Sequence, residues 1–197
     1  SLLLTEEAIF HAWRRSYEQV DIFIAPSAFL TDLIEQRIPR EKIQILHNGI
    51  DQNSYQPRYT DQGYALYFGR VSKEKGVRTL LLAHQALEAN LPLKIVGTGP
   101  LAEELEREFP EVDFVGYQSG RTLEDLIALS AFVVVPSEWY ENCSMAIMEA
   151  MAFGKPIIGS CIGGIPEQIE DGKTGFLFEM GNVSELGEKI EILANYA

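Results

Sequence analysis

The chain has 197 residues, of which 46% are hydrophobic and 23% charged, a composition that supports a substantial core and is ordinary for a soluble protein. Its 29 acidic residues against 16 basic ones give a net charge of -13, which argues against non-specific binding to nucleic acid or to anionic lipid. No apolar stretch approaches the roughly 20 residues that cross a bilayer, and no secretory signal is recognisable. Cys143 and Cys161 are the only cysteines and have no metal-ligand spacing, so we interpret them as free thiols and expect a cytoplasmic location.

Apolar runs alternate with amphipathic segments along almost the whole chain. In chain order, the patterns predict a helix over 5–20, a strand over 21–25, a helix over 27–36 and a strand over 43–47. Residues 52–62 are polar without periodicity and are interpreted as a linker. Beyond the linker, the predicted elements are strand 64–68, helix 76–88, strand 93–96, helix 100–108, strand 112–115, helix 122–129, strand 132–135, a helix starting near 142 or 143, strand 156–159, helix 166–170, strand 175–178 and helix 183–196.

This strict alternation of strands and helices predicts βαβ units and an α/β fold. Such units build a parallel, doubly wound, Rossmann-like sheet with helices on both faces. The part after the linker holds six predicted strands, enough for a complete sheet. The part before it holds two strands and two helices, too little to fold as a domain alone. The opening Ser1 without an initiator Met hints at a fragment or a processed product.

Three basic residues, Arg70, Lys73 and Lys75, follow the first strand after the linker. In a doubly wound sheet, ligands bind at the carboxyl ends of the strands. Arg70 could hold a phosphate with two hydrogen bonds, and Lys75 could add a second positive charge. A solvated basic loop is the alternative interpretation of the same residues.

A glycine-rich turn follows the next strand. Gly97-Thr-Gly99-Pro-Leu-Ala102 satisfies the G-x-G-x-x-G/A pattern of dinucleotide sites, but such sites also need an acid at the end of the following strand. That strand ends at Gly116-Tyr117, without an acid. Gly97 and Gly99 therefore permit either a close approach of the backbone to a ligand or a tight turn. Gly116 and Tyr117 could contact a base or form a surface turn.

Glu141 and Glu149 stand eight positions apart around a predicted helix start. With that start near residue 142 or 143, Glu149 would lie roughly 9 Å further along the axis. The free amides at the helix start attract phosphate. Two carboxylates that bind hydroxyl groups, placed around a phosphate-binding helix end, could hold a sugar nucleotide. The alternative is one acid near the positive helix end and one solvated acid. No spacing of cysteines or aspartates suggests a metal site.

Taken together, these motifs resemble the retaining glycosyltransferases of family 4, which have the two-domain GT-B architecture. The matching residues, in the family's order, are Asn48-Gly-Ile-Asp51, Gly69-Arg70 with Lys75-Gly76, Val96-Gly-Thr-Gly-Pro100, Phe114-Val-Gly116, Pro136-Ser137, Glu141-x7-Glu149-Ala-Met-Ala-x-Gly154-x-Pro156, Gly163-Gly164 with Glu167, and Asp171-Gly-Lys-Thr-Gly175. Each motif alone is weak, but the ordered set is specific.

The resemblance implies a division of the chain into parts. Residues 63–197 would form the domain that binds the nucleotide-sugar donor. Residues 1–51 would be the tail of an incomplete N-terminal acceptor domain, joined by the linker 52–62. The rest of that domain, and a terminal helix that crosses back to it, would be missing.

The resemblance also implies a role for each matched residue. Arg70 and Lys75 would bind the donor diphosphate and stabilise the leaving group without a metal or other cofactor. Glu149 would accept hydrogen bonds from the ribose, and Glu141 would contact the transferred sugar. Backbone amides around Ser144 and Met145 would hold phosphate, with Gly116 and Tyr117 beside the base.

One departure concerns the helix start, where the family often has Glu-Pro-Phe-Gly-Leu and this chain has Glu141-Asn-Cys-Ser144-Met145. Ser144 in place of glycine restricts the backbone conformations open to this residue. This puts in doubt the contact between the backbone amides at the helix start and the phosphate.

The expected function is that of the donor-binding part of a hexosyltransferase in polysaccharide biosynthesis. It would transfer sugar from a nucleotide diphosphate sugar to a saccharide or lipid-linked acceptor, with a possible peripheral membrane contact of the full enzyme. Alone, the chain would bind nucleotide without transferring sugar. The alternatives are a non-transferring GT-B enzyme, an NAD-dependent oxidoreductase domain, and a non-catalytic module that binds nucleotide sugars.

Overall fold

A computed structural model describes residues 16–87 and 91–195 of the chain, which divides into two compact units, Ser1–His47 and Asn48–Ala197. Most of the predicted helix over 5–20 lies outside the described residues. Its described end forms a short 3-10 helix, η1 (Ser16–Gln19).

The first unit contains a small parallel sheet. Strands β1 (Phe23–Ala25) and β2 (Ile43–Ile45) pair in register from Phe23 opposite Ile43. Helix α2 (Ala28–Ile34) and the 3-10 helix η2 (Arg40–Lys42) connect them. Helix α2 begins where the sequence predicts, because the Ser27 hydroxyl accepts the Leu30 amide at 3.1 Å and caps its first turn.

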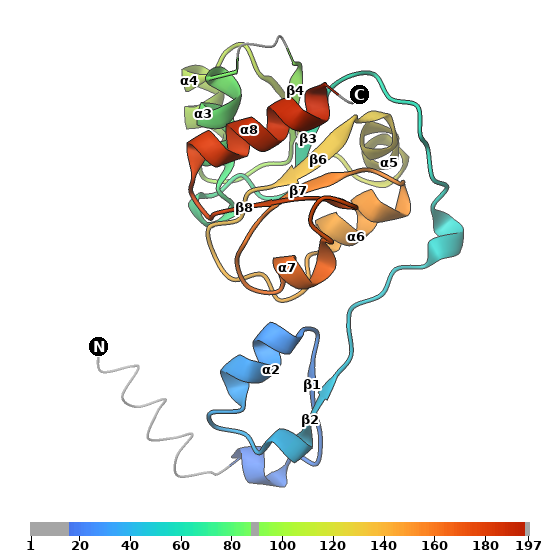
Figure 1. Cartoon of the computed structure of the whole chain (residues 1–197), viewed down its shortest axis with the longest axis vertical. Coiled ribbons are helices and arrows are strands. Elements are labelled where there is room, and N and C mark those ends of the chain that lie inside the picture. Colours follow the sequence, from blue (N-terminus) through green and yellow to red (C-terminus); the bar gives the residue numbers. More distant parts are fainter. Residues whose placement is uncertain (1–15, 88–90, 196–197) are drawn as a thin grey trace. The chain divides into compact units, whose positions relative to one another are not determined.

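The second unit is built on a six-stranded parallel sheet in the order β5-β4-β3-β6-β7-β8 (Figure 1). The strands are β3 (Ala65–Phe68), β4 (Leu93–Val96), β5 (Asp113–Gly116), β6 (Phe132–Val135), β7 (Ile157–Ser160) and β8 (Gly175–Phe178). Along the chain, β4 and β5 are added on one side of β3. The chain then returns to form β6 on the other side of β3, and β7 and β8 follow outward from there. The prediction of a doubly wound, Rossmann-like α/β sheet is confirmed.

Helices cover both faces of this sheet, and they bury the strands β3, β6 and β7 on both sides. Along β3, Ala65 and Tyr67 pack in one apolar cluster with side chains of α3 (Val77–Gln85), α4 (Ala102–Glu108) and α8 (Val183–Ala194). Leu66 and Phe68 point to the opposite cluster, with α5 (Gly120–Leu129), α6 (Met145–Ala152) and α7 (Ile165–Gln168). The alternation follows from the two-residue period of a strand. Within the described residues, no helix has the length and apolarity to cross a membrane.

Short 3-10 helices mark two connections of the second unit. Helix η3 (Gln52–Ser54) lies within the predicted linker, and η4 (Lys73–Lys75) stands between β3 and α3. The prediction that a helix starts near residue 142 or 143 is wrong: α6 begins at Met145. Glu141 and Ser144 instead bond to Gly164 and Gln168, which follow β7, and Ser144 keeps an extended backbone with ψ 119°.

Candidate functional site

The strand order reverses between β3 and β6, so the loops that follow these two strands lie side by side. In an open parallel sheet, ligands bind in the crevice outside the carboxyl ends of the strands at such a switch point. Residues 69–76 follow β3 and residues 136–144 follow β6. These loops carry Arg70, Lys75 and Glu141, so three predicted site residues are brought to the switch point.

Glycines let these loops pack backbone against backbone. A Cβ on Gly97 would lie 1.8 Å from the carbonyl oxygen of Gly69, and one on Gly76 would lie 1.8 Å from that of Pro136. Both glycines also adopt positive φ, 137° and 65°, which side chains rarely allow. The backbone that approaches Gly97 closely is therefore that of the neighbouring loop, and Gly99 meets Val71 in the same way.

Lys75 and Glu141 form an ion pair across the switch point. The Lys75 ammonium donates to Oε1 of Glu141, which also accepts the Ser137 hydroxyl at 2.9 Å. The side chains are 34% and 20% exposed, so a ligand can reach both. Burial, with a contribution from Glu141, raises the pKa of Tyr67. Tyr67 therefore stays protonated and donates to the Arg70 carbonyl at 2.7 Å, which fixes the start of this loop.

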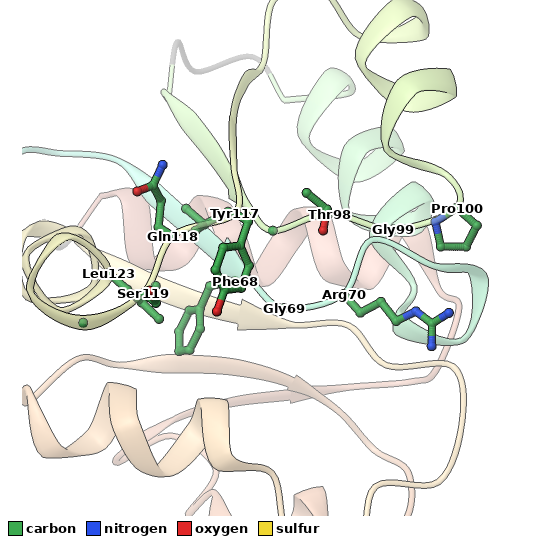
Figure 2. Close-up of a pocket in the computed structure, with 13 residues that line it drawn as sticks. Phe68, Gly69, Arg70, Thr98, Gly99, Pro100, Tyr117, Gln118, Ser119 and Leu123 are labelled. Carbon is green, nitrogen blue, oxygen red and sulfur yellow. The ribbon is translucent and has the colours of Figure 1, made fainter.

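A cleft of about 580 Å³ opens at the carboxyl ends of β3, β4 and β5. Its size suits a small-molecule ligand, for which pockets of about 300–1,000 Å³ are usual. Figure 2 shows the Arg70 guanidinium beside Pro100 at one end, and Ser119 and Leu123 at the other. Among the described residues, none forms a hydrogen bond or a close ion pair with that guanidinium, although its positive charge acts on the Glu74 carboxylate of the same loop.

Tyr117 lies between these ends of the cleft and is 72% exposed. With Phe68 it lines the cleft with aromatic surface, on which a planar ring can stack. Gly116, just before it, ends β5 with φ 75°, and its carbonyl accepts the Gly97 amide at 2.8 Å. Of the predicted residues, Arg70, Gly97, Gly99 and Tyr117 thus line one cleft.

Glu149 lies one turn into α6 and is partly buried, and this burial raises the pKa of its carboxyl. Within residues 16–87 and 91–195, no hydrogen bond or ion pair engages that carboxylate. Met145 begins the helix and is 42% exposed. The amide of Ser144, expected to be free for phosphate, instead donates to Oε1 of Gln168 at 2.7 Å. The prediction of a free amide at Ser144 is therefore wrong in this structure.

Three residues from β7 to α7 hold the loop that carries Glu141, and sequence reasoning gave none of them this role. The Ser160 hydroxyl donates to the Ser137 carbonyl at 2.7 Å, and the Gly164 amide to the Glu141 carbonyl at 2.6 Å. Gln168 bonds Ser144. In the sequence, the glycine-rich loop around Gly163 was the one available signal for these contacts, and it does not show which loop it would bond to.

The described residues contain no group of three or more His, Cys, Asp or Glu side chains that could hold a metal ion. The site presents two cations, Arg70 and Lys75, and the Glu141 carboxylate, which is paired to Lys75. It also presents the Glu149 carboxylate, with which no described residue pairs, and the backbone amides at the start of α6. This set suits an anion that also carries hydroxyl groups.

The chain is similar to known proteins over most of its length. Residues 62–195 match the family described as "Glycosyl transferases group 1". The sulfoquinovosyl transferase of Arabidopsis thaliana is 31% identical over 90% of this chain and 38% of its own length. The lipopolysaccharide 1,2-N-acetylglucosaminetransferase of Salmonella typhimurium is 32% identical over 78% of this chain and 47% of its own.

Solved structures share the fold. HepE of Anabaena in complex with UDP superposes with a TM-score of 0.81 at 24% identity, covering 89% of this chain and 54% of that one. Its complex with UDP-glucose gives a TM-score of 0.78 at 26% identity, covering 87% and 53%. The chain therefore spans about half the length of HepE and less than half that of the two curated relatives.

Proposed function

Because this chain belongs to the group 1 glycosyl transferases, we propose that it is the donor-binding part of a retaining, GT-B-type glycosyltransferase. Its substrate would be a nucleotide diphosphate sugar. The observation that carries the proposal is the pairing of Lys75 with Glu141 at the switch point, next to the cleft that Arg70 lines. A diphosphate needs cations there, and a transferred sugar needs a hydroxyl-binding carboxylate.

The two cations act on the leaving group. When the bond between the sugar and the diphosphate breaks, its electron pair stays on the diphosphate. Arg70 and Lys75, held in place by the packed loops, stabilise that growing negative charge. The diphosphate competes with Glu141 for Lys75, which leaves the Glu141 carboxylate able to accept hydrogen bonds from the sugar. No metal is needed in this proposal, because the two side chains supply the positive charge.

The remaining residues orient the nucleoside and the phosphates. Glu149 accepts hydrogen bonds from the ribose hydroxyls, with a carboxylate that no described residue already engages. Tyr117 and Gly116 lie beside the base. The amides of Met145, Ala146 and Ile147 have no acceptor within α6 and hold a phosphate at its positive end.

The acceptor is proposed to be a saccharide or a lipid-linked saccharide. A relative supports this class, since the Salmonella typhimurium enzyme is a lipopolysaccharide 1,2-N-acetylglucosaminetransferase. The structure of HepE with UDP-glucose supports a nucleotide sugar as donor. A cytoplasmic location with peripheral membrane contact fits this class of substrate. We also propose that the 197-residue chain alone binds nucleotide without transferring sugar.

Calorimetric titration with UDP, GDP and ADP, each with and without EDTA, tests this proposal. Binding of one nucleotide, unchanged by EDTA, would support the donor-binding role and identify the base. Binding that disappears with EDTA would contradict the metal-independent mechanism. No binding of any nucleotide would contradict the proposal that this chain alone holds the donor.

A non-catalytic module that binds nucleotide sugars is the second candidate, because the same geometry would serve it. Sugar transfer by the complete protein separates the two. An NAD-dependent oxidoreductase has less support, since Gly97 and Gly99 follow the second strand of the sheet and pack on a neighbouring loop. Titration with NAD should therefore give no heat.

A further inference from the structure

Gln168, at the end of α7, binds both backbone polar groups of Ser144. Its Oε1 accepts the Ser144 amide at 2.7 Å, and its Nε2 donates to the Ser144 carbonyl at 3.1 Å. A side-chain amide donates from its nitrogen and accepts at its oxygen at the same time, so it can bind the amide and the carbonyl of one residue together, and Gln has a longer reach than Asn.

The bonded residue is the last one before α6. Ser144 stands at the N-cap of α6, yet its own side chain makes no capping hydrogen bond. Its carbonyl accepts the first bond of the helix, from the Met148 amide at 3.3 Å. Gln168 therefore fixes the peptide groups on both sides of Ser144, and so the direction in which the first free amides of α6 point.

This contact is the last of three along one segment. Ser160, Gly164 and Gln168 bond in turn to Ser137, Glu141 and Ser144. The loop 136–144 contains no helix or strand of its own, and such loops are mobile unless they are held. The segment from β7 to α7 thus acts as a template for the loop that carries Glu141.

We propose that Gln168 is a positioning residue for the donor site. By holding Ser144 through two hydrogen bonds, it aims the amides of Met145 to Ile147 at the donor diphosphate and keeps Glu141 opposite Lys75. The inference rests on the proposed function. The Ser144 amide donates to Gln168 and not to the phosphate. A serine in place of the family's glycine therefore does not remove a phosphate contact in this proposal.

Two variants of this chain, measured side by side, test the inference. Gln168→Met keeps the length and loses both hydrogen bonds. Asn182→Ala is the matched control, because it removes a side-chain cap of α8, where Asn182 Oδ1 accepts the Glu185 amide at 3.1 Å. Melting temperature, amide hydrogen exchange and calorimetric affinity for UDP, GDP and ADP are measured for both variants and for the unchanged chain.

Both variants should melt at a lower temperature than the unchanged chain. Gln168→Met should speed amide exchange at Ser144 and weaken nucleotide binding about tenfold, the scale of one well-placed hydrogen bond to an anion. Asn182→Ala should speed exchange at Glu185 and leave nucleotide affinity unchanged.

Several results would overturn the positioning role. One is faster exchange at Ser144 in Gln168→Met with unchanged nucleotide affinity, since the bonds would then exist without serving the ligand. Another is an equal loss of affinity in Asn182→Ala, which would make the effect one of stability alone. If the unchanged chain binds no nucleotide, the proposed function of this chain fails and the positioning role falls with it, while exchange at Ser144 still reports whether the bonds form.

A second variant covers the case in which Gln168→Met does not fold. Gln168→Glu keeps an acceptor for the Ser144 amide, loses the donor to its carbonyl, and adds negative charge beside the start of α6. Negative charge there favours the helix but repels an anionic ligand. Retained stability with weaker nucleotide binding is expected, and binding equal to that of the unchanged chain would overturn the inference.

Discussion

The two sides of the site are held in different ways. On the side formed by the ends of β3, β4 and β5, the backbone is fixed while the side chains of Arg70 and Tyr117 stay exposed. On the side formed by β6 and α6, the Glu141 side chain is held as well, since it accepts from Lys75 and Ser137, and Gln168 binds the backbone of Ser144.

This difference indicates which half of the site adapts to its ligand. A bound side chain has already lost its conformational freedom, so it can be oriented with little further cost when the ligand arrives. An exposed side chain on a rigid backbone can adjust to the ligand it meets. Glu141 is thus the less adaptable part of the site, and Arg70 and Tyr117 are the more adaptable part.

The largest effect on stability should come from a substitution that separates the loop after β3 from the loop after β6, which pack backbone against backbone at Gly76. Gly76→Ala should lower the free energy of unfolding by about 3 kcal/mol, because a Cβ there combines positive φ with overlap on Pro136. Gly181→Ala is the control: its φ of 76° is similar but nothing lies within 4 Å, so about 1 kcal/mol is expected. Urea denaturation checks both, and equal losses would show that the contact between the loops is unimportant.

Arg70→Ala tests the exposed side. Nucleoside diphosphate affinity should fall about 10- to 100-fold, the loss expected for charge-assisted hydrogen bonds, with little change in stability. Arg107→Ala removes the same charge from an exposed position on α4, where the guanidinium bonds only the Glu103 carbonyl among the residues described. Titration calorimetry of both variants separates local binding from net charge, and equal losses would rule out a specific role for Arg70.

Glu141→Gln tests the β6 and α6 side, and it should raise nucleotide affinity where Arg70→Ala lowers it. Removing the carboxylate frees Lys75 for the diphosphate, so nucleotide should bind two- to fivefold more tightly, the worth of a partly exposed ion pair. Sugar transfer by the complete enzyme should be lost. Titration of this chain and a transfer assay on the complete enzyme check the two parts. Weaker nucleotide binding would mean that Lys75 needs Glu141 to be placed correctly.

Glu149→Gln should give the smallest effect on stability. Burial raises the folded-state pKa of Glu149, so between the unfolded and folded pKa values the folded chain binds more protons, and its stability falls as pH rises. Above that window the charged carboxylate is a net cost, so the variant should be more stable at pH 7, by less than about 0.5 kcal/mol. The gain should vanish as pH falls below the ordinary glutamate pKa. Denaturation at several pH values checks this, and a variant less stable at pH 7 would show that the carboxylate has a stabilising partner.

The sequence by itself determined the doubly wound sheet. Strands such as Phe132–Val135 are apolar throughout, and helices such as Val183–Ala194 are amphipathic. Both patterns of hydrophobic residues are local properties of the chain, so they can be read from the sequence. It also indicated that Arg70, Lys75 and Glu141 would lie at one edge of the sheet, since the carboxyl ends of parallel strands share that edge. Roles for these residues stay predictions until binding is measured.

Only the tertiary structure decided what each loop is bonded to. The residues that precede α6, Glu141 and Ser144, bond to Gly164 and Gln168, which stand more than twenty residues further along the chain. Gly97 and Gly76 likewise face the backbone of loops from other strands. Such contacts join residues distant in the chain and leave no periodic pattern in it, so no local signal could have shown that Gln168 holds the helix start.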